Sequence, residues 1–198
     1  KNRDSSSYHH DLYDYVRGDN TRLNSSQTAA EATGYLTFDG DGFSLTSGGG
    51  INTNNHSHVA WCWEAGGAPT ATNSAGAGAT PTAGSVKIDG SNLGSALAGS
   101  IAATKLSANT ARGFSLVAFT GNGSAGATIA HGLGAAPEWI ILKSRDNSRD
   151  WRVYHTSLGA TKTIDLNNNG AEQGPNDAYW DDTAPTSSVF SVGDVTTV

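Results

Sequence analysis

The stretch "GFSLVAFTGNGSAGATIAHGLGAAPEWIIL", residues 113–142, decides the fold class of this chain. It contains three apolar segments rich in β-branched and aromatic residues, and glycine-rich turn sequences separate them. We predict strands at residues 114–121, 127–134 and 138–144, with the second strand as the hairpin partner of the first. Turn signals recur about every 8–12 residues along this part of the chain, which is typical of β-sandwiches and barrels.

Further strands are predicted towards the end of the chain, in "DWRVYHTS" (150–157), "KTIDLN" (162–167) and "SSVFSV" (187–192). The first of these alternates with period two, so we expect one buried face and one solvated face. One face would carry Trp151, Val153 and His155, and the opposite face Arg152, Tyr154 and Thr156.

The composition supports a β-rich structural protein. Of 198 residues, 25 are glycine and only 15% are charged, and helix-forming residues are scarce. The net charge of −6 gives no electrostatic footprint for nucleic acid, and no apolar run approaches the ~18 residues that insertion into a membrane requires. The single cysteine cannot form an intrachain disulfide. Methionine is absent even at position 1, so we expect an internal or processed segment of a longer protein.

The chain also repeats itself. Four segments of its first part match four segments of its last part in the same order, namely 1–7 with 143–149, 12–18 with 153–159, 23–31 with 166–172, and 42–45 with 189–192. The two copies are out of phase, because only the second follows a segment like 113–142 and only the first continues into "INTNNHSHVAWCWEAGG". One explanation is that the missing parts lie in a longer parent protein. The other is that a neighbouring chain completes each unit by donating strands.

This pattern predicts two related antiparallel β-sandwich units of a lectin-like or jelly-roll type. Residues 1–67 would be the C-terminal part of one unit and residues 113–198 the N-terminal part of the next. Residues 68–112 would be a low-complexity connector rich in Gly, Ala and Thr. Inside it, "SVKIDG" (85–90) is a candidate strand ending in a turn, and "SALAGSIAATKL" (95–106) is a weak candidate for a short helix.

The segment "HSHVAWCWEAGG", residues 56–67, holds two histidines, the only cysteine and two tryptophans. On a strand, His56 and Cys62 would lie about 20 Å apart, too far to share one metal ion with ligand bonds near ~2 Å. His56 and His58 alone could share an ion if other ligands came from elsewhere. We favour a central strand packed on both faces, in which Cys62 is a buried structural thiol.

Two acidic segments are the remaining candidates for chemistry. "DGDG" (39–42) places Asp39 and Asp41 in a tight turn, and calcium binding there stays an open alternative. "YWDD" (179–182) places two carboxylates beside two aromatic rings, which suits a loop, a glycan contact or, least of all, hydrolysis. The candidate glycan-binding residues are Trp151, Tyr179, Trp180, Asp181 and Asp182. We predict no catalytic residues, no metal site and no cofactor.

Taken together, "GFSLVAFTGNGSAGATIAHGLGAAPEWIILKSR", "WRVYHTSLGATK", "DTAPTSSVFSVG" and "HVAWCWEAGG" resemble a repeated domain of large virion proteins from tailed bacteriophages, of the marine and cyanobacterial type. The resemblance covers residues 1–67 and 113–198. It implies a β-sandwich in tail fibres or other surface appendages, with no defined catalytic residues.

The resulting hypothesis is a structural, non-enzymatic protein of the virion surface, in a tail fibre, appendage or decoration, that also attaches to the host. Its expected partners are copies of itself in a trimer or polymer, other virion proteins and host-surface glycans, but not nucleic acid. One alternative is a glycan-binding lectin-like module, which requires an exposed aromatic platform at Trp180 or Trp151. A second alternative is a non-viral surface filament or adhesin subunit.

Overall fold

The structure is a computed structural model that describes residues 1–46 and 48–194. In this part of the chain it is all-β and contains no helix, which confirms the predicted fold class. It follows that none of the described residues belongs to a helix that could cross a membrane. In chain order, the described strands are β1 (Asp11–Leu12), β2 (Thr21–Asn24), β3 (Ala32–Thr33), β4 (Leu36–Phe38), β5 (Phe43–Leu45), β6 (Val86–Ile88), β7 (Ser91–Asn92), β8 (Ala103–Asn109), β9 (Phe114–Phe119), β10 (Ala127–Ala130), β11 (Trp139–Leu142), β12 (Arg152–His155), β13 (Ile164–Asp165) and β14 (Val189–Val192).

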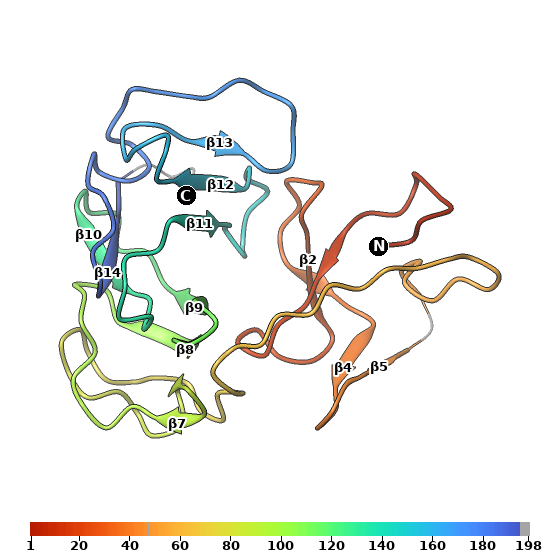
Figure 1. Cartoon of the computed structure of the whole chain (residues 1–198), viewed down its shortest axis with the longest axis horizontal. Coiled ribbons are helices and arrows are strands. Elements are labelled where there is room, and N and C mark those ends of the chain that lie inside the picture. The colour runs from red at the N-terminus through yellow and green to blue at the C-terminus, as the bar shows by residue number, and fades with distance from the viewer. Residues whose placement is uncertain (47, 195–198) are drawn as a thin grey trace.

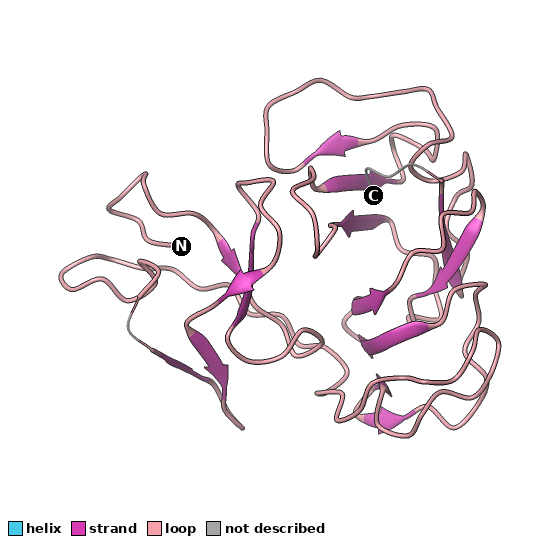
Figure 2. Ribbon diagram, turned by 180° about the vertical axis from the view of Figure 1, so that it is seen from behind, coloured by secondary structure: helices cyan, strands magenta, loops and turns pink. Residues whose placement is uncertain are grey.

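The strands form small sheets of two to four strands, and their pairing is antiparallel except between β6 and β8. The sheet orders are β1-β2-β3, β4-β5, β7-β6-β8-β9, β10-β14 and β11-β12-β13. Figures 1 and 2 show β1–β5 on one side of the molecule and β6–β14 on the other, and the chain after β5 crosses between them. We refer to residues 1–58 as the N-terminal part and to residues 66–194 as the C-terminal part.

The four-stranded sheet β7-β6-β8-β9 lies largely within residues 68–112, the segment that we predicted from the sequence to be a connector. Asp89 and Gly90 both have positive φ, 49° and 84°, and form the two-residue hairpin turn between β6 and β7. This confirms the strand and turn expected at 85–90. The helix considered at 95–106 does not form, because β8 begins within this segment and pairs with both β6 and β9. β6, β7 and β8, which lie between residues 86 and 109, therefore belong to a packed sheet, and this part of the chain is not a free linker.

Two predictions about the later strands are wrong. β10 does not form a hairpin with β9, because β10 pairs with β14 while β9 pairs with β8. β12 does not have one wet face, because Trp151 through Tyr154 are all buried and only His155 is exposed. The reason is that β12 is the central strand of its sheet and that residues 177–182 cover its second face. There the ring of Tyr154 meets that of Trp180 at a centroid distance of 5.8 Å.

The hydrophobic core lies in the C-terminal part. One cluster centres on Leu106 of β8, a second on Ile129 of β10 and a third on Trp180. Val117 packs against the first and second clusters, and Ile140 against the second and third, so the three form one continuous core. None of these clusters draws a residue from the N-terminal part, so that part depends on contacts with the rest of the chain.

Those contacts join the loop between β11 and β12 to the loop after β2. The buried Trp151 donates its indole N–H to the carbonyl oxygens of Asn24 and Gln27, each at 3.0 Å. The Arg149 N–H donates to Thr28 O at 2.9 Å. The accepting carbonyl groups lie at the end of β2 and in the loop after it, so these bonds tie the two parts of the molecule together.

The internal repeat is visible in the hydrogen bonds of the two parts. Ser25 N–H donates to His10 O at 3.0 Å, and Leu166 N–H donates to Trp151 O at 3.0 Å, with the same spacing between donor and acceptor. This equivalence places Ser25, and not Leu23, at the position of Leu166. The sequence match of 23–31 with 166–172 is thus shifted by two residues, because strand pairing and not the shared "LN" dipeptide sets the register.

The turns that follow β1 and β12 are equivalent as well. Gly18 N–H donates to Asp14 O at 3.0 Å, and Gly159 N–H donates to His155 O at 3.2 Å. Both glycines have positive φ, 91° and 77°, a conformation that favours glycine over other residues. The two parts of the chain therefore share a strand, turn and strand motif.

Candidate functional site

The predicted glycan-binding tryptophans lie in the interior of the protein. Trp180 is only 2% exposed and packs on Tyr154, and Trp151 is 5% exposed and holds the loop after β2. Neither ring is available to stack on a sugar. The indole nitrogen of Trp180 has no hydrogen-bond partner within residues 1–46 and 48–194, so its role there is packing.

The other three candidates form the turn that covers β12. The Tyr179 hydroxyl donates to Gln173 Oε1 at 3.0 Å, and the Arg152 guanidinium lies 4.6 Å from the centre of the Tyr179 ring. Asp181 and Asp182 both adopt the left-handed backbone conformation, with φ of 51° and 47°. Two such residues in succession reverse the chain, which places Trp180 beneath it. The structure therefore brings the "YWDD" residues together as a turn with a buried tryptophan.

Asp39 and Asp41 lie in the hairpin loop between β4 and β5. The Asp39 N–H donates to Gly42 O at 2.9 Å, and the Ser44 hydroxyl donates to Asp39 Oδ2 at 2.8 Å. This accounts for Asp39 as a turn residue. Among the described residues, no group of three or more His, Cys, Asp or Glu side chains is arranged to hold a metal ion.

His56 and His58 contact the backbone and one side chain. His58 Nδ1 lies 3.0 Å from the His56 carbonyl oxygen, and His58 Nε2 lies 3.1 Å from that of Gly50. His56 Nδ1 lies 2.9 Å from the side-chain nitrogen of the buried Asn2. These contacts fasten residues 50–58 to the chain's first residues.

The prediction of a buried strand around Cys62 is wrong. Cys62 is exposed, and Trp61 and Trp63 are 64% and 62% exposed. We call residues 59–65 the tryptophan segment. From Ala60 to Ala65, its backbone groups make no hydrogen bond to any other residue of the described structure. The sequence pattern of a two-sided strand is present, but nothing within the described chain covers it.

Both ends of the tryptophan segment are fixed. At its first residue, Val59 exchanges two backbone hydrogen bonds with Lys1, of 3.0 Å and 3.1 Å. After it, Gly66 lies so close to β8 that a Cβ there would overlap the Ala108 carbonyl group, and Gly66 O accepts a hydrogen bond from Gly90 N–H at 2.9 Å. The segment is thus fixed at both ends, and the exposed Trp61 and Trp63 lie between these two attachment points.

The side chains of this segment make few contacts. Trp63 stacks on Phe114, with ring centroids 6.2 Å apart, and Glu64 pairs with Arg112 at 3.1 Å. Both members of that ion pair are about two-thirds exposed, so the pair contributes little. The exposed rings therefore offer a large apolar surface that the described chain does not use.

A second exposed apolar surface lies on β11. This strand is at the edge of its sheet, and Trp139 and Ile141 on one face are 58% and 39% exposed. An edge strand with exposed apolar side chains is a template for pairing with another chain.

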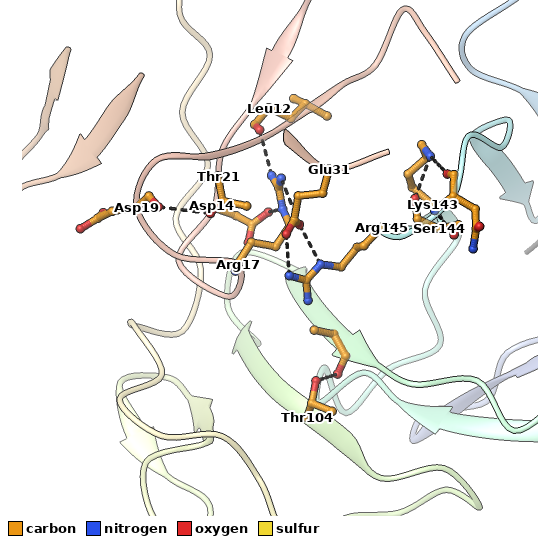
Figure 3. A network of polar contacts seen from close by, with 12 residues as sticks. Leu12, Asp14, Arg17, Asp19, Thr21, Glu31, Thr104, Lys143, Ser144 and Arg145 are labelled. Carbon is orange, nitrogen blue, oxygen red and sulfur yellow. Dashed lines mark hydrogen bonds and ion pairs between the residues drawn. The ribbon is translucent and has the colours of Figure 1, made fainter. Parts of the chain in front are cut away.

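The boundary between the two parts holds a cluster of charged side chains. Figure 3 shows Arg17, Asp14, Glu31 and Arg145 converging there from the N-terminal part and from the loop after β11. Arg145 binds both carboxylate oxygens of Glu31, at 2.7 Å and 2.8 Å. No local sequence pattern points to these residues, because Glu31 and Arg145 are 114 positions apart in the chain and only the fold brings them together.

The comparison with known families agrees with the structural repeat. The chain matches the domain of unknown function DUF7483 twice, over residues 1–90 and over residues 85–198. The chain belongs to the DUF7483 family. The two DUF7483 matches confirm the two repeated units, and they meet at residues 85–90, inside the segment treated as a connector from sequence. No curated protein and no solved structure matches the chain.

Proposed function

We propose that this chain is an architectural, non-enzymatic protein of a bacteriophage tail fibre or surface appendage. It assembles when the tryptophan segment of one copy adds to the edge strand β11 of a neighbouring copy. The exposure of Trp61 and Trp63 on an unpaired segment carries the proposal. The all-β fold, the two DUF7483 units and the resemblance to repeated virion domains support it.

Strand addition would give a partner both to the unpaired tryptophan segment and to the free edge of β11. The tryptophan segment has unpaired backbone groups and alternating side chains, and β11 has a free edge and exposed Trp139 and Ile141. Pairing an extended segment with a sheet edge forms main-chain hydrogen bonds, and burial of the alternating apolar side chains stabilises the contact. Because each chain carries both surfaces, the contact is head to tail and generates a ring or a polymer.

The molar mass of the native protein tests this assembly, by light scattering coupled to size exclusion. We expect the wild-type chain to form a trimer or larger species, and the Trp61→Ser/Trp63→Ser variant to be monomeric with an unchanged far-ultraviolet circular dichroism spectrum. Leu166→Ser, at another exposed apolar position, is the matched control and should assemble like the wild type. A monomeric wild-type protein at tens of micromolar would show that the proposal is wrong.

The virion location needs a separate test. Mass spectrometry of purified phage particles should detect peptides of this chain. Absence from particles combined with presence on cell surfaces would favour the filament or adhesin alternative. A glycan-binding role through Trp151 or Trp180 is not proposed, because both rings are buried.

A further inference from the structure

An open cleft of about 210 Å³ lies at the boundary between the two parts of the molecule. Its walls come from segments far apart in the sequence, and three of its side chains are cationic. The polar residues that line it are Arg17, Thr72, Thr104, Lys105 and Arg145. A cluster of three cations is unusual in a chain with a net charge of −6.

Arg17 is the most constrained of the three cations. Its side chain is 6% exposed, its Nε donates to Asp14 Oδ2 at 2.6 Å, and its Nη2 donates to Leu12 O at 2.9 Å. Its Nη1 is buried and makes no hydrogen bond within the described structure, and it lies 3.9 Å from Glu31 Oε2. A buried N–H of a charged group that has no acceptor lowers the stability of the folded state. We therefore expect this nitrogen to donate a hydrogen bond to an oxygen atom of a ligand.

Arg145 and Lys105 complete the positive side of the cleft. Arg145 uses Nε and Nη2 for Glu31, which leaves its Nη1 for a ligand (Figure 3). Lys105 is half-buried, and its Nζ makes no hydrogen bond or ion pair with another described residue. The register of β8 against β9 shifts between Ala103 and Lys105, and such a bulge re-aims side chains away from the regular strand pattern.

The cations of the cleft are unequally paired. Asp14 pairs with Arg17, Glu31 pairs with Arg145, and Asp146 is a further negative charge near Arg145, whereas Lys105 has no ion pair with another described residue. The Thr104 hydroxyl donates to Ala118 O at 2.9 Å and carries no charge. An anionic group that accepts hydrogen bonds from Arg17 Nη1, Arg145 and Lys105 would satisfy the buried nitrogen and pair with Lys105.

We propose that this cleft is a binding site for an oxyanion, of the kind carried by sulfate, phosphate or a carboxylate. The anion is either a free ion or a group on an acidic polysaccharide, since both present the same oxygens. Because its ligands come from both parts of the chain, a bound oxyanion also stabilises their relative position. This site is independent of the assembly surface on the tryptophan segment.

Isothermal titration calorimetry with sodium sulfate on the full chain tests the site, with sodium chloride at equal ionic strength as the blank. We expect one sulfate to bind per chain. Lys105→Gln should weaken the affinity about tenfold, the usual effect of losing one charge-assisted hydrogen bond. Lys162→Gln removes the same charge from an exposed pair with Glu172 and should change the affinity less than about twofold.

A second titration distinguishes the two sources of the anion, with dextran sulfate compared against unsulfated dextran. Tight binding of dextran sulfate without measurable binding of free sulfate would assign the site to an acidic polysaccharide. Equal affinity per sulfate group would assign it to a small oxyanion. The proposal is overturned if the wild-type chain binds neither probe above the chloride blank, or if Lys105→Gln and Lys162→Gln bind with the same affinity.

Discussion

The Glu31 carboxylate accepts two hydrogen bonds from the Arg145 guanidinium, 2.7 Å from Nε and 2.8 Å from Nη2, across 114 residues of sequence. The backbones of the same two residues are joined as well, because the Glu31 N–H donates a hydrogen bond to Arg145 O at 2.7 Å. This side-chain pair holds one wall of the cationic cleft and joins the two DUF7483 units at one point.

Removing this pair should destabilise the protein. We expect Glu31→Gln to lower the free energy of unfolding by about 1–2 kcal/mol, since the bidentate pair is lost and Arg17 loses a nearby negative charge. Urea denaturation measures this change. Glu172→Gln, in the exposed pair with Lys162, is the matched control and should have an effect below about 0.5 kcal/mol. Equal effects of the two variants would contradict a specific role for the pair of Glu31 and Arg145.

The two buried tryptophans should respond differently to loss of the indole N–H. Trp151→Phe removes two hydrogen bonds to Asn24 O and Gln27 O and should cost about 2–3 kcal/mol more than the lost volume alone. Trp180→Phe removes no hydrogen bond of the described structure, so only the packing loss remains. Denaturation of both variants, with amide hydrogen exchange over residues 21–33, checks the difference. A similar loss of unfolding free energy in the two variants, or unchanged amide hydrogen exchange in Trp151→Phe, would contradict the role of Trp151 in holding the N-terminal part.

The buried His131 should make stability depend on pH. Its Nε2 lies 3.1 Å from Thr186 O and its Nδ1 accepts from Leu133 N–H at 3.2 Å, an arrangement of the neutral ring. Burial lowers the pKa of His131 below its ordinary value, so the unfolded chain takes up the proton first. Stability is therefore full above about pH 7 and falls as the pH drops through about 6.5 towards the folded pKa.

Chemical denaturation between pH 8 and pH 5 measures this effect. We expect wild-type stability to fall with a slope of at most about 1.4 kcal/mol per pH unit from this residue, and His131→Gln to flatten the profile. A profile of the same steepness in wild type and His131→Gln would rule out this residue as the cause.

Cys62 should react as an exposed thiol. In dilute solution, a maleimide reagent should label it fully without denaturant, because the side chain is exposed between two exposed tryptophans. At concentrations where the chain assembles, labelling should slow several-fold, since pairing of the tryptophan segment would cover it. Slow labelling at every concentration would mean that residues 59–65 are buried within the single chain after all.

Several features followed from the sequence by local rules. The strands at β9, β11 and β14 lie where β-branched and aromatic residues cluster, and the turn after β6 lies at the Asp89–Gly90 dipeptide. These features depend on residues within a few positions of one another, which is why a linear pattern predicts them. The internal repeat was also visible, although its register was shifted by two residues around Leu23.

The same local rules failed wherever a partner distant in sequence decided the outcome. Cys62 and its neighbouring tryptophans have the pattern of a buried strand, yet they are exposed because no described segment lies over them. Trp180 has the pattern of a ligand platform beside two aspartates, yet the turn formed by these aspartates folds it against Tyr154. Apolar character alone is the same in both cases, and burial depends on what else reaches the site.

The sequence by itself thus determined the all-β class, most strand positions, the turns and the presence of two related units. Only the tertiary structure decided that β10 pairs with β14, that β6, β7 and β8 join β9 in one sheet, and that Arg17, Lys105 and Arg145 line one cleft. The physical reason is that backbone preferences act between neighbours in the chain. Strand pairing, burial and charge clustering arise between residues that only folding brings together, and each competes with alternatives of similar local pattern.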